Sequence, residues 1–230
     1  MDSSLYRERT DNKKAFAGQV FKLFTNAVNL KTEHIFADVL YGKYEVESFS
    51  YGDDYNYHQV LGYFTQVVIP HKIAVFNAGV EFLKNRDFLG FIAEGRDLWV
   101  DNLWIHDMSK FSANEAFGYA FHDFKSKKED IPFERAWNHH KNHNPHHPEY
   151  WLSVNKEGDV VAMEMPRIYV AEMVADWIGA GMVYGSSLEQ WLPNNLHRFK
   201  WHGNTALSVW RMLKMIGIET ELNGSVLTCK

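Results

Sequence analysis

Apolar residues recur at helical spacing along much of the chain, and this pattern predicts a mainly helical protein. Lys13 to Asn29 is predicted to be an amphipathic helix, because its apolar positions repeat every three or four residues. A shorter helix is predicted over 33–41, and 42–57 has no period and is predicted to be a loop. A long helical pattern begins near His58. Pro70 is expected to kink that helix or divide it in two, because proline lacks the backbone N–H.

The second half of the chain continues the helical pattern. Pro166 suits the first position of a helix that continues to Gly179 or Gly181. One or two more helices are expected between Leu188 and Ile218, and no regular structure is predicted from Glu219 onward. The other segments with a helical pattern are 97–108, 112–126 and 133–141.

One segment has the pattern of strands. Val154 to Met165 contains two short apolar runs separated by Asn155–Asp159, as in a small hairpin. The predicted fold is therefore all-α with at most one small β-hairpin. No internal repeat or linker interrupts the chain, and 230 residues fall within the range of one domain. We expect a single domain over 1–230 with its core at about 58–183 and helical additions at both ends.

Composition narrows the class of protein. Hydrophobic residues make up 46% and charged residues 23%, as in soluble globular proteins. The net charge of −5 argues against sequence-independent nucleic-acid binding but permits a nucleotide or phosphate substrate. Cys229 is the sole cysteine, which favours a reducing compartment. Without a signal-peptide pattern or an apolar run of membrane-spanning length, a soluble, cytoplasmic protein with no membrane partner is expected.

The segment from Trp104 to Lys110, near the middle of the chain, contains several side chains that could bind a metal or a substrate. His106 and Asp107 are adjacent, and Lys110 follows three residues later. Imidazole and carboxylate side by side can ligate one metal ion, and the second carboxylate oxygen can reach another. An ammonium close by can hold an anionic substrate. The cluster predicts a metal site that acts on an anion.

Histidines are concentrated in a second segment. Five of the twelve lie within nine residues, which is the composition cue for metal binding. Trp137 and Trp151 flank the segment and are expected to anchor it in a core, although a solvent-facing polar loop is the alternative. We expect two ligands, one from each adjacent pair, with the choice within each pair open. The five are His139, His140, His143, His146 and His147.

Two further helices contribute candidates. Asp176 lies in an otherwise apolar helix, where a carboxylate needs a cation or a partner, and Glu172 shares its face. The alternative for Asp176 is an ion pair with Arg167 or Arg198. His71 taken alone is more typical of a hydrogen-bonded core histidine than of a ligand.

The order His71, then His106-Asp107, then Asp176, resembles the HD-domain superfamily of metal-dependent phosphohydrolases. His106 to Lys110 is similar to that superfamily's His-Asp-x-Gly-Lys variant, with Ser109 in place of glycine. The His-rich and Glu-Met-Val-Ala-Asp-Trp segments also look like an uncharacterised HD-like family of phage and bacterial proteins. The resemblance implies an HD-like helical bundle.

The resemblance also implies a ligand set. His71, His106, Asp107 and Asp176 would hold a first metal. Asp107 would bridge to a second, held by one of His139/His140 and one of His146/His147. Imidazole and carboxylate ligands favour one or two divalent transition metals (Mn, Fe, Co, Ni or Zn), with Mg as a further candidate.

The expected reaction is hydrolysis of a nucleotide or related phosphate ester by a metal-activated water. Asp107, Lys110 and His143 are the expected catalytic residues, with His143 as the proton donor. Lys110, Lys141 and Glu172 are expected to contact the substrate. Two alternatives stay open, an HD-type mixed-valent di-iron oxygenase and a non-catalytic, metal-stabilised binding protein. Homo-oligomerisation is also left open.

Overall fold

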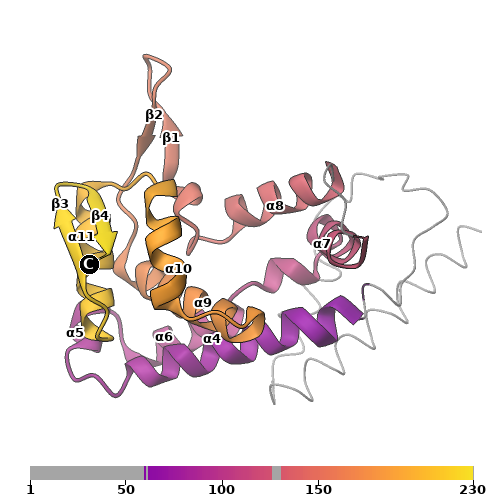
Figure 1. The fold of residues 1–230 in the computed structure, drawn as a ribbon, viewed down its shortest axis with the longest axis horizontal. Helices are drawn as coiled ribbons and strands as arrows, with labels where there is room; N and C mark the ends of the chain where they lie inside the picture. Colours follow the sequence, from indigo (N-terminus) through magenta and orange to yellow (C-terminus); the bar gives the residue numbers. More distant parts are fainter. Residues whose placement is uncertain (1–59, 61, 126–130, 230) are drawn as a thin grey trace, which may run out of the picture. The chain divides into compact units, whose positions relative to one another are not determined.

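Helices make up most of the structure, a computed structural model that describes residues 60, 62–125 and 131–229 (Figure 1). The prediction of a mainly α-helical protein is confirmed. The predicted helices at 13–29 and 33–41 and the predicted loop at 42–57 lie outside the described residues.

The chain divides into two compact units. The first unit contains the described residues up to Ile69 and those within Met108–His139, and the second unit contains Pro70–Asp107 and the described residues from His140 onward. Each unit is described by itself below. The single domain expected from the sequence stays a prediction.

Aromatic side chains fill the interior of the first unit. The rings of Phe64 and Phe111 lie 4.9 Å apart, and those of Tyr63 and Tyr119 are stacked at 5.8 Å. A Cβ at Gly118 would lie 2.5 Å from the Pro132 carbonyl oxygen, so two helices approach closely there. The elements are the π-helix Phe64–Val68, the 3₁₀ helix Met108–Phe111, α7 at Ala113–Lys125 and most of α8 at Ile131–His143.

The proline expected to kink or divide a helix lies just after the π-helix. Residues 64–68 form this wider turn, and α4 continues from Ile69 to Phe82 with Pro70 as its second residue. Proline in a regular α-helix clashes with the carbonyl four residues earlier, and a π-turn relieves that contact. The chain therefore stays helical through Pro70.

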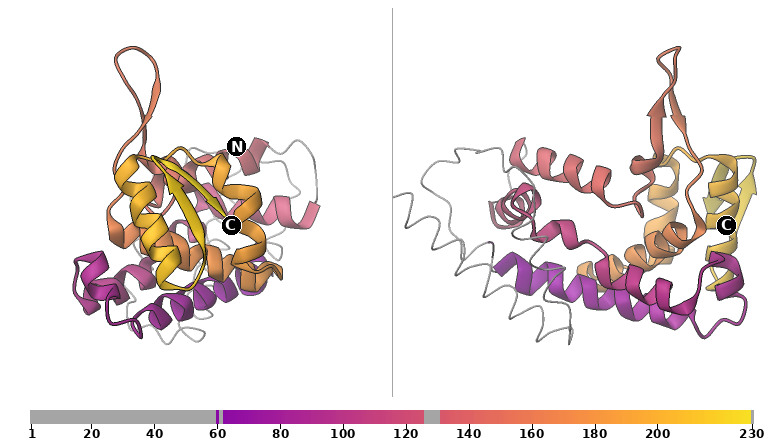
Figure 2. Two further views of the ribbon diagram at one scale, coloured as in Figure 1. Left: turned by 60° about the vertical axis from the view of Figure 1, so that its left-hand side comes forward. Right: turned by 180° about the vertical axis from the view of Figure 1, so that it is seen from behind.

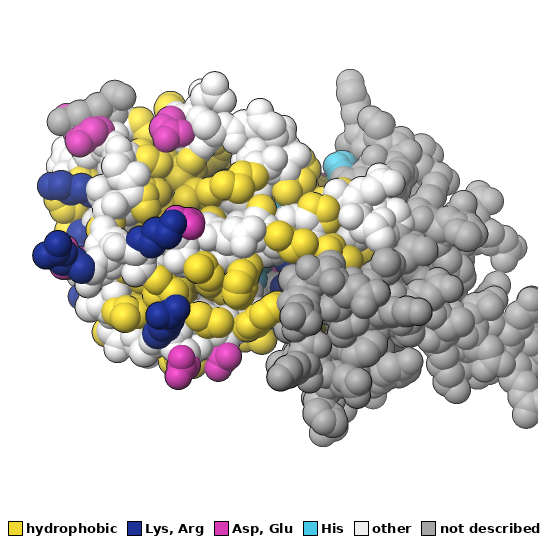
Figure 3. Space-filling view, turned by 90° about the horizontal axis from the view of Figure 1, so that it is seen from below, with side chains coloured by type: hydrophobic (Ala, Val, Ile, Leu, Met, Phe, Trp, Pro, Cys, Tyr) yellow, Lys and Arg dark blue, Asp and Glu magenta, His cyan; other side chains and the backbone are white. Residues whose placement is uncertain are grey.

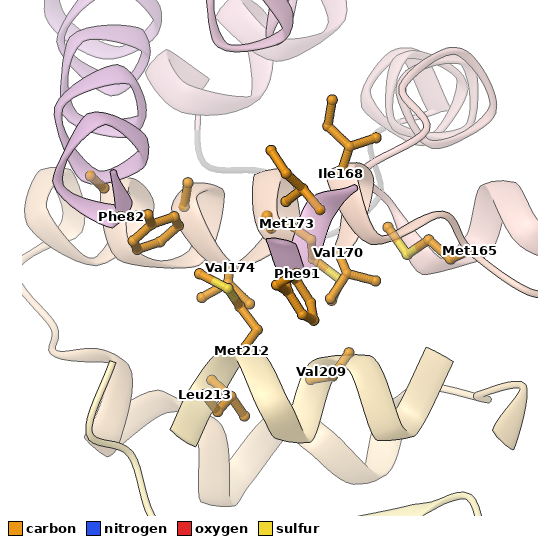
Figure 4. Close-up of a cluster of buried hydrophobic side chains, with 14 of the residues drawn as sticks. Phe82, Phe91, Met165, Ile168, Val170, Met173, Val174, Val209, Met212 and Leu213 are labelled. Atoms are coloured by element: carbon orange, nitrogen blue, oxygen red, sulfur yellow. The ribbon is translucent and has the colours of Figure 1, made fainter. Parts of the chain in front are cut away.

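The second unit is organised around α9 at Arg167–Tyr184, a helix that is apolar on almost every side. It contacts α4 at Gly179 and packs against further helices on its other sides, and a helix surrounded in this way is buried. Figure 4 shows Val174 of α9 and Phe91 pointing toward Met212. The surrounding helices are α5 at Phe88–Ile92, α6 at Arg96–Ile105, α10 at Leu188–Asn195 and α11 at Gly203–Met215.

Two antiparallel hairpins complete the second unit. β1 (Leu152–Val154) pairs with β2 (Val160–Ala162) across the turn predicted at Asn155–Asp159, although β1 begins two residues before the predicted start at Val154. This hairpin projects from the unit (Figures 1 and 2). β3 (Thr220–Asn223) pairs with β4 (Val226–Cys229), where the sequence predicts no regular structure. Leu227 of β4 is buried, so packing onto the helical core stabilises this second hairpin.

Part of the surface is apolar. Figure 3 shows hydrophobic side chains gathered in patches between scattered charged residues on the face seen from below. Large exposed apolar side chains include Leu98, Ile105, Met182 and Tyr184. Over the described ranges, the helices lack the length and apolar character that crossing a membrane requires.

Candidate metal centre

α4 and α9 carry His71 and Asp176 to the same point. The two helices approach closely at Gly179, where a Cβ would lie 2.5 Å from Val75 Cγ2 and 2.8 Å from the Val75 backbone nitrogen. His71 is one turn before Val75, and Asp176 is one turn before Gly179, so both side chains lie on the facing sides. His71 Nε2 consequently lies 2.9 Å from Asp176 Oδ1.

His106 and Asp107 lie in a turn and not in a helix. The sequence predicts a helix to Met108, but α6 ends at Ile105 and Asp107 has a left-handed backbone with φ of 55°. Aspartate tolerates this conformation better than most residues. The buried Lys72 ammonium donates to the carbonyl oxygens of Trp104 and His106, and so stabilises the end of α6.

The last turn of α8 and the loop after it supply three more imidazoles, from His140, His146 and His147. The Asn144 amide lies 3.0 Å from His140 Nδ1 and donates to the His140 carbonyl oxygen at 2.8 Å. The Trp151 indole N–H donates to the Pro145 carbonyl oxygen at 2.7 Å. The loop is therefore anchored by Asn144 and, as predicted, by Trp151.

The first donor group consists of His71, His106, Asp107 and Asp176, each offering one atom within 4.8 Å of the others. His106 Nε2 lies 3.4 Å from His71 Nε2, 3.4 Å from Asp107 Oδ2 and 3.5 Å from Asp176 Oδ1. His71 Nε2 lies 3.4 Å from Asp107 Oδ2. Three segments far apart in sequence thus converge on one point.

The second donor group consists of Asp107, His140, His146 and His147. His140 Nε2 lies 3.3 Å from Asp107 Oδ1, and His146 Nε2 lies 3.5 Å from the same oxygen. Asp107 therefore directs Oδ2 to the first donor group and Oδ1 to the second. A carboxylate placed in this way is suited to bridging two cations.

The spacing of these atoms fits a bound cation. Ligand atoms about 2.1 Å from one tetrahedral ion lie roughly 3.4 Å from each other. Most of the distances in both groups are close to that value and longer than good hydrogen bonds between the same atoms, whereas the 2.9 Å between His71 Nε2 and Asp176 Oδ1 is a hydrogen-bond distance. His146 Nε2 is shielded from solvent and makes no hydrogen bond to any described residue. A cation would satisfy this buried lone pair.

Glu172 contacts one histidine of each donor group. Its Oε1 is 2.8 Å from His106 Nδ1 and 3.1 Å from His146 Nδ1, and its Oε2 accepts a hydrogen bond from Asn102 Nδ2 at 2.6 Å. Glu172 is predicted from the sequence to contact the substrate. In the structure both of its oxygens contact side chains of the protein.

The electrostatic environment of the two donor groups favours positive charge. Burial opposes a charge on His106, but Asp107, Asp176 and Glu172 outweigh it and raise the pKa of His106 from 6.5 to about 9. Burial likewise opposes ionisation of Glu172, yet the imidazoles of His146 and His106 lower its pKa to about 2. Burial and the neighbouring His146 and His140 hold the pKa of His147 well below its usual value.

Other predicted site residues lie outside the two donor groups. His139 Nδ1 is 2.7 Å from Glu115 Oε1 in the first unit, so it is His140 of this pair that faces Asp107. The Lys110 ammonium lies 5.7 Å from the centre of the Tyr119 ring, also in the first unit. His143 is exposed and Lys141 is half-buried near the end of α8. Their predicted roles stay predictions.

Residues 61–216 match the sequence model of DUF5662, a family of unknown function. The chain belongs to DUF5662. The matched DUF5662 region includes every residue of both donor groups. No curated protein and no solved structure gives a significant match to the chain.

Several residues that shape the centre were not predicted from the sequence. Lys72 and Asn144 contact residues at or beside the donors, Asn102 holds Glu172, and Gly179 permits the close helix approach. Lys72 follows His71 directly within an apolar helix. A charged residue beside a candidate ligand in such a helix is the one signal that was available.

Proposed function

We propose that this protein is a metal-dependent phosphohydrolase acting on a nucleotide or related phosphate ester. One observation supports it above all, the convergence of two buried donor groups on the two oxygens of Asp107. Paired cations about 3.5–4 Å apart are a recurring arrangement in phosphate-ester chemistry. The resemblance to the HD-domain superfamily points to the same reaction.

The donor residues fit such cations. His71, His106, Asp107 and Asp176 would hold one divalent transition metal. Asp107, His140 and His146 would hold a second, with His147 beside them. Once bound, such a cation lowers the pKa of a coordinated water and polarises a phosphoryl oxygen.

Protein groups supply the remaining chemistry in this proposal. Asp107 sets the spacing between the two sites, because its two oxygens face different donor groups. Lys110, three residues after Asp107, would neutralise phosphate charge. His143 would protonate the leaving alkoxide, and Lys141 would contact the phosphate.

Metal content and phosphate release test the proposal. Protein purified without chelator is expected to contain up to two equivalents of metal, and to release phosphate from a nucleotide panel with Mn, Co or Zn. Asp107→Ala should abolish both. Asp101→Ala, which removes an exposed carboxylate of α6, should leave both unchanged. Metal-loaded protein that hydrolyses none of the phosphate esters would overturn the proposal.

The imidazole-rich second donor group favours a second candidate, an oxygenase with a mixed-valent pair of irons. Three histidines and one shared carboxylate suit iron as well as zinc. Two bound irons, the EPR signal of a mixed-valent pair and substrate-dependent oxygen uptake would identify it. A protein that binds metal without either activity would be the non-catalytic binding protein.

A further inference from the structure

Glu172 contacts one imidazole of each donor group through a single oxygen atom. Its side chain is buried on α9, with only 5% of its surface exposed. Oε1 is 2.8 Å from His106 Nδ1 and 3.1 Å from His146 Nδ1. His106 belongs to the first donor group and His146 to the second. One carboxylate thus joins the two groups from the side opposite the Nε2 atoms.

These contacts determine which ring nitrogen carries the hydrogen. An ionised carboxylate can only accept hydrogen bonds, so each contacting Nδ1 must donate. A neutral ring that donates from Nδ1 has its lone pair on Nε2. In both rings, Nε2 is the atom that faces Asp107. Glu172 therefore selects the tautomer that can bind a cation in each group.

Glu172 is itself held in place. Its second oxygen, Oε2, accepts a hydrogen bond from Asn102 Nδ2 at 2.6 Å. Asn102 is buried on α6, four residues before His106. Glu172 and Asp176 are one turn apart on α9. The same helix therefore carries Asp176, which is a member of the first donor group, and Glu172, which contacts His106 and His146.

Glu172 with His106 and His146 also has the donor types of a third cation site. The distances of 2.8 and 3.1 Å, however, are those of ordinary N–H···O hydrogen bonds. A cation there would require Nδ1 as the ligand in both rings. The lone pair of each ring would then lie on Nδ1 and not on the Nε2 atom that faces Asp107. The hydrogen-bonded arrangement leaves the lone pairs where both larger groups use them.

We propose that Glu172 is a positioning residue that orients one imidazole from each donor group toward its cation site. The inference rests on the two-metal centre proposed above. Because burial and Asn102 hold Glu172 in place, the rings of His106 and His146 are oriented before a cation binds. Each cation therefore binds with less loss of conformational freedom.

Zinc titration of the full chain tests this positioning role. Glu172→Met keeps side-chain bulk but removes both acceptors, and is expected to weaken binding at both sites about 10–100-fold. Glu172→Gln keeps an acceptor oxygen and should give a smaller loss. Glu164→Gln is the matched control, because that carboxylate is exposed and contacts Asn204; its titration should equal that of the wild type.

Nitrogen NMR of the zinc-loaded protein gives a second readout, one that a purely structural role would not change. Wild-type protein should show His106 and His146 with zinc on Nε2 and a slowly exchanging proton on Nδ1. Glu172→Gln should weaken the protection of both protons together. Because the wild type alone reports the tautomers, the test holds even if Glu172→Met does not fold.

The outcomes separate the two proposals. A proton on Nε2 of either ring, or unchanged zinc affinity in Glu172→Met, overturns the role of Glu172 and leaves phosphohydrolysis standing. Weaker zinc binding in Glu172→Met, together with wild-type protons on Nδ1 and no phosphate release, supports the role of Glu172 and overturns the hydrolase. Absence of any zinc binding by the wild type overturns both.

Discussion

Asp107 has an uncommon backbone conformation, and its side chain contacts residues of both donor groups. Its φ of 55° turns the chain sharply after α6, and its two oxygens face different donor groups. A left-handed conformation at a non-glycine residue persists only where its surroundings support it. The Lys72 ammonium gives that support, since it donates to the carbonyl oxygens of residues on the N-terminal side of the turn.

Lys72→Met should therefore impair both the fold and the centre. Carbonyl oxygens that lose a buried charged donor cost about 1–3 kcal/mol of unfolding free energy. We also expect weaker metal binding, because the turn that presents Asp107 loses its support. Urea unfolding and zinc titration measure the two effects. Lys84→Met, which removes an exposed lysine paired with Glu81, should change neither.

Adjacent histidines are expected to differ in function. His140 Nε2 lies 3.3 Å from Asp107, whereas His139 Nδ1 lies 2.7 Å from Glu115. His140→Ala should lower the metal content of purified protein by one equivalent, and His139→Ala should leave it unchanged. Elemental analysis after gel filtration measures the content. Equal loss in both variants would contradict the assignment of the second donor group.

Among the elements, α4 and α9 determine the precision of the centre. Both helices are largely apolar, so packing decides how close they come, and Gly179 lets them approach to backbone contact with Val75. That contact is one turn from the 2.9 Å pair of His71 and Asp176. A small residue away from the chemistry thus controls a distance within it.

Gly179→Ala should move the helices apart. Its methyl group would lie 2.8 Å from the Val75 backbone nitrogen, which cannot move without displacing α4. Overpacking of this kind costs about 1–3 kcal/mol, and we expect weaker metal binding in the first donor group as well. Thermal unfolding and zinc titration are the measurements. Gly90→Ala in α5 is the control, because no atom lies within 4 Å of its added Cβ and stability should not fall.

For the whole molecule, metal binding and folding should be linked. The donors come from four separate stretches of the second unit, so the centre exists only when that unit is folded. A ligand that binds the folded chain alone stabilises it by mass action.

Metal removal should consequently lower the melting temperature. At a free metal concentration of 100 times the Kd, the stabilisation is about 2.7 kcal/mol. Each kcal/mol corresponds to roughly 2–4 °C for a chain of this size, so chelation should lower Tm by about 5–11 °C. Differential scanning calorimetry with and without chelator measures the shift. Asp107→Ala should show none, and a shift of the same size in that variant would contradict the link.

Local features of the protein could be predicted from its residues alone. Apolar periodicity predicted the helical class, and the turn residues at 155–159 predicted the β1–β2 hairpin. Histidines and carboxylates in an apolar setting indicated a metal centre. These signals could be read because periodicity, turn chemistry and residue type depend on neighbours along the chain.

Which atoms meet depends on how distant segments pack, and this could not be predicted from the sequence. The early end of α6 depends on Lys72, and the β3–β4 hairpin depends on the core that buries Leu227. The choice of His140 over His139, and the contact of Glu172 with two rings, depend on distances between separate segments. Neighbouring residues carry the same chemistry, so their composition cannot distinguish them. Helix packing distinguishes these neighbours, because it brings one side chain within reach of Asp107 and directs the other elsewhere.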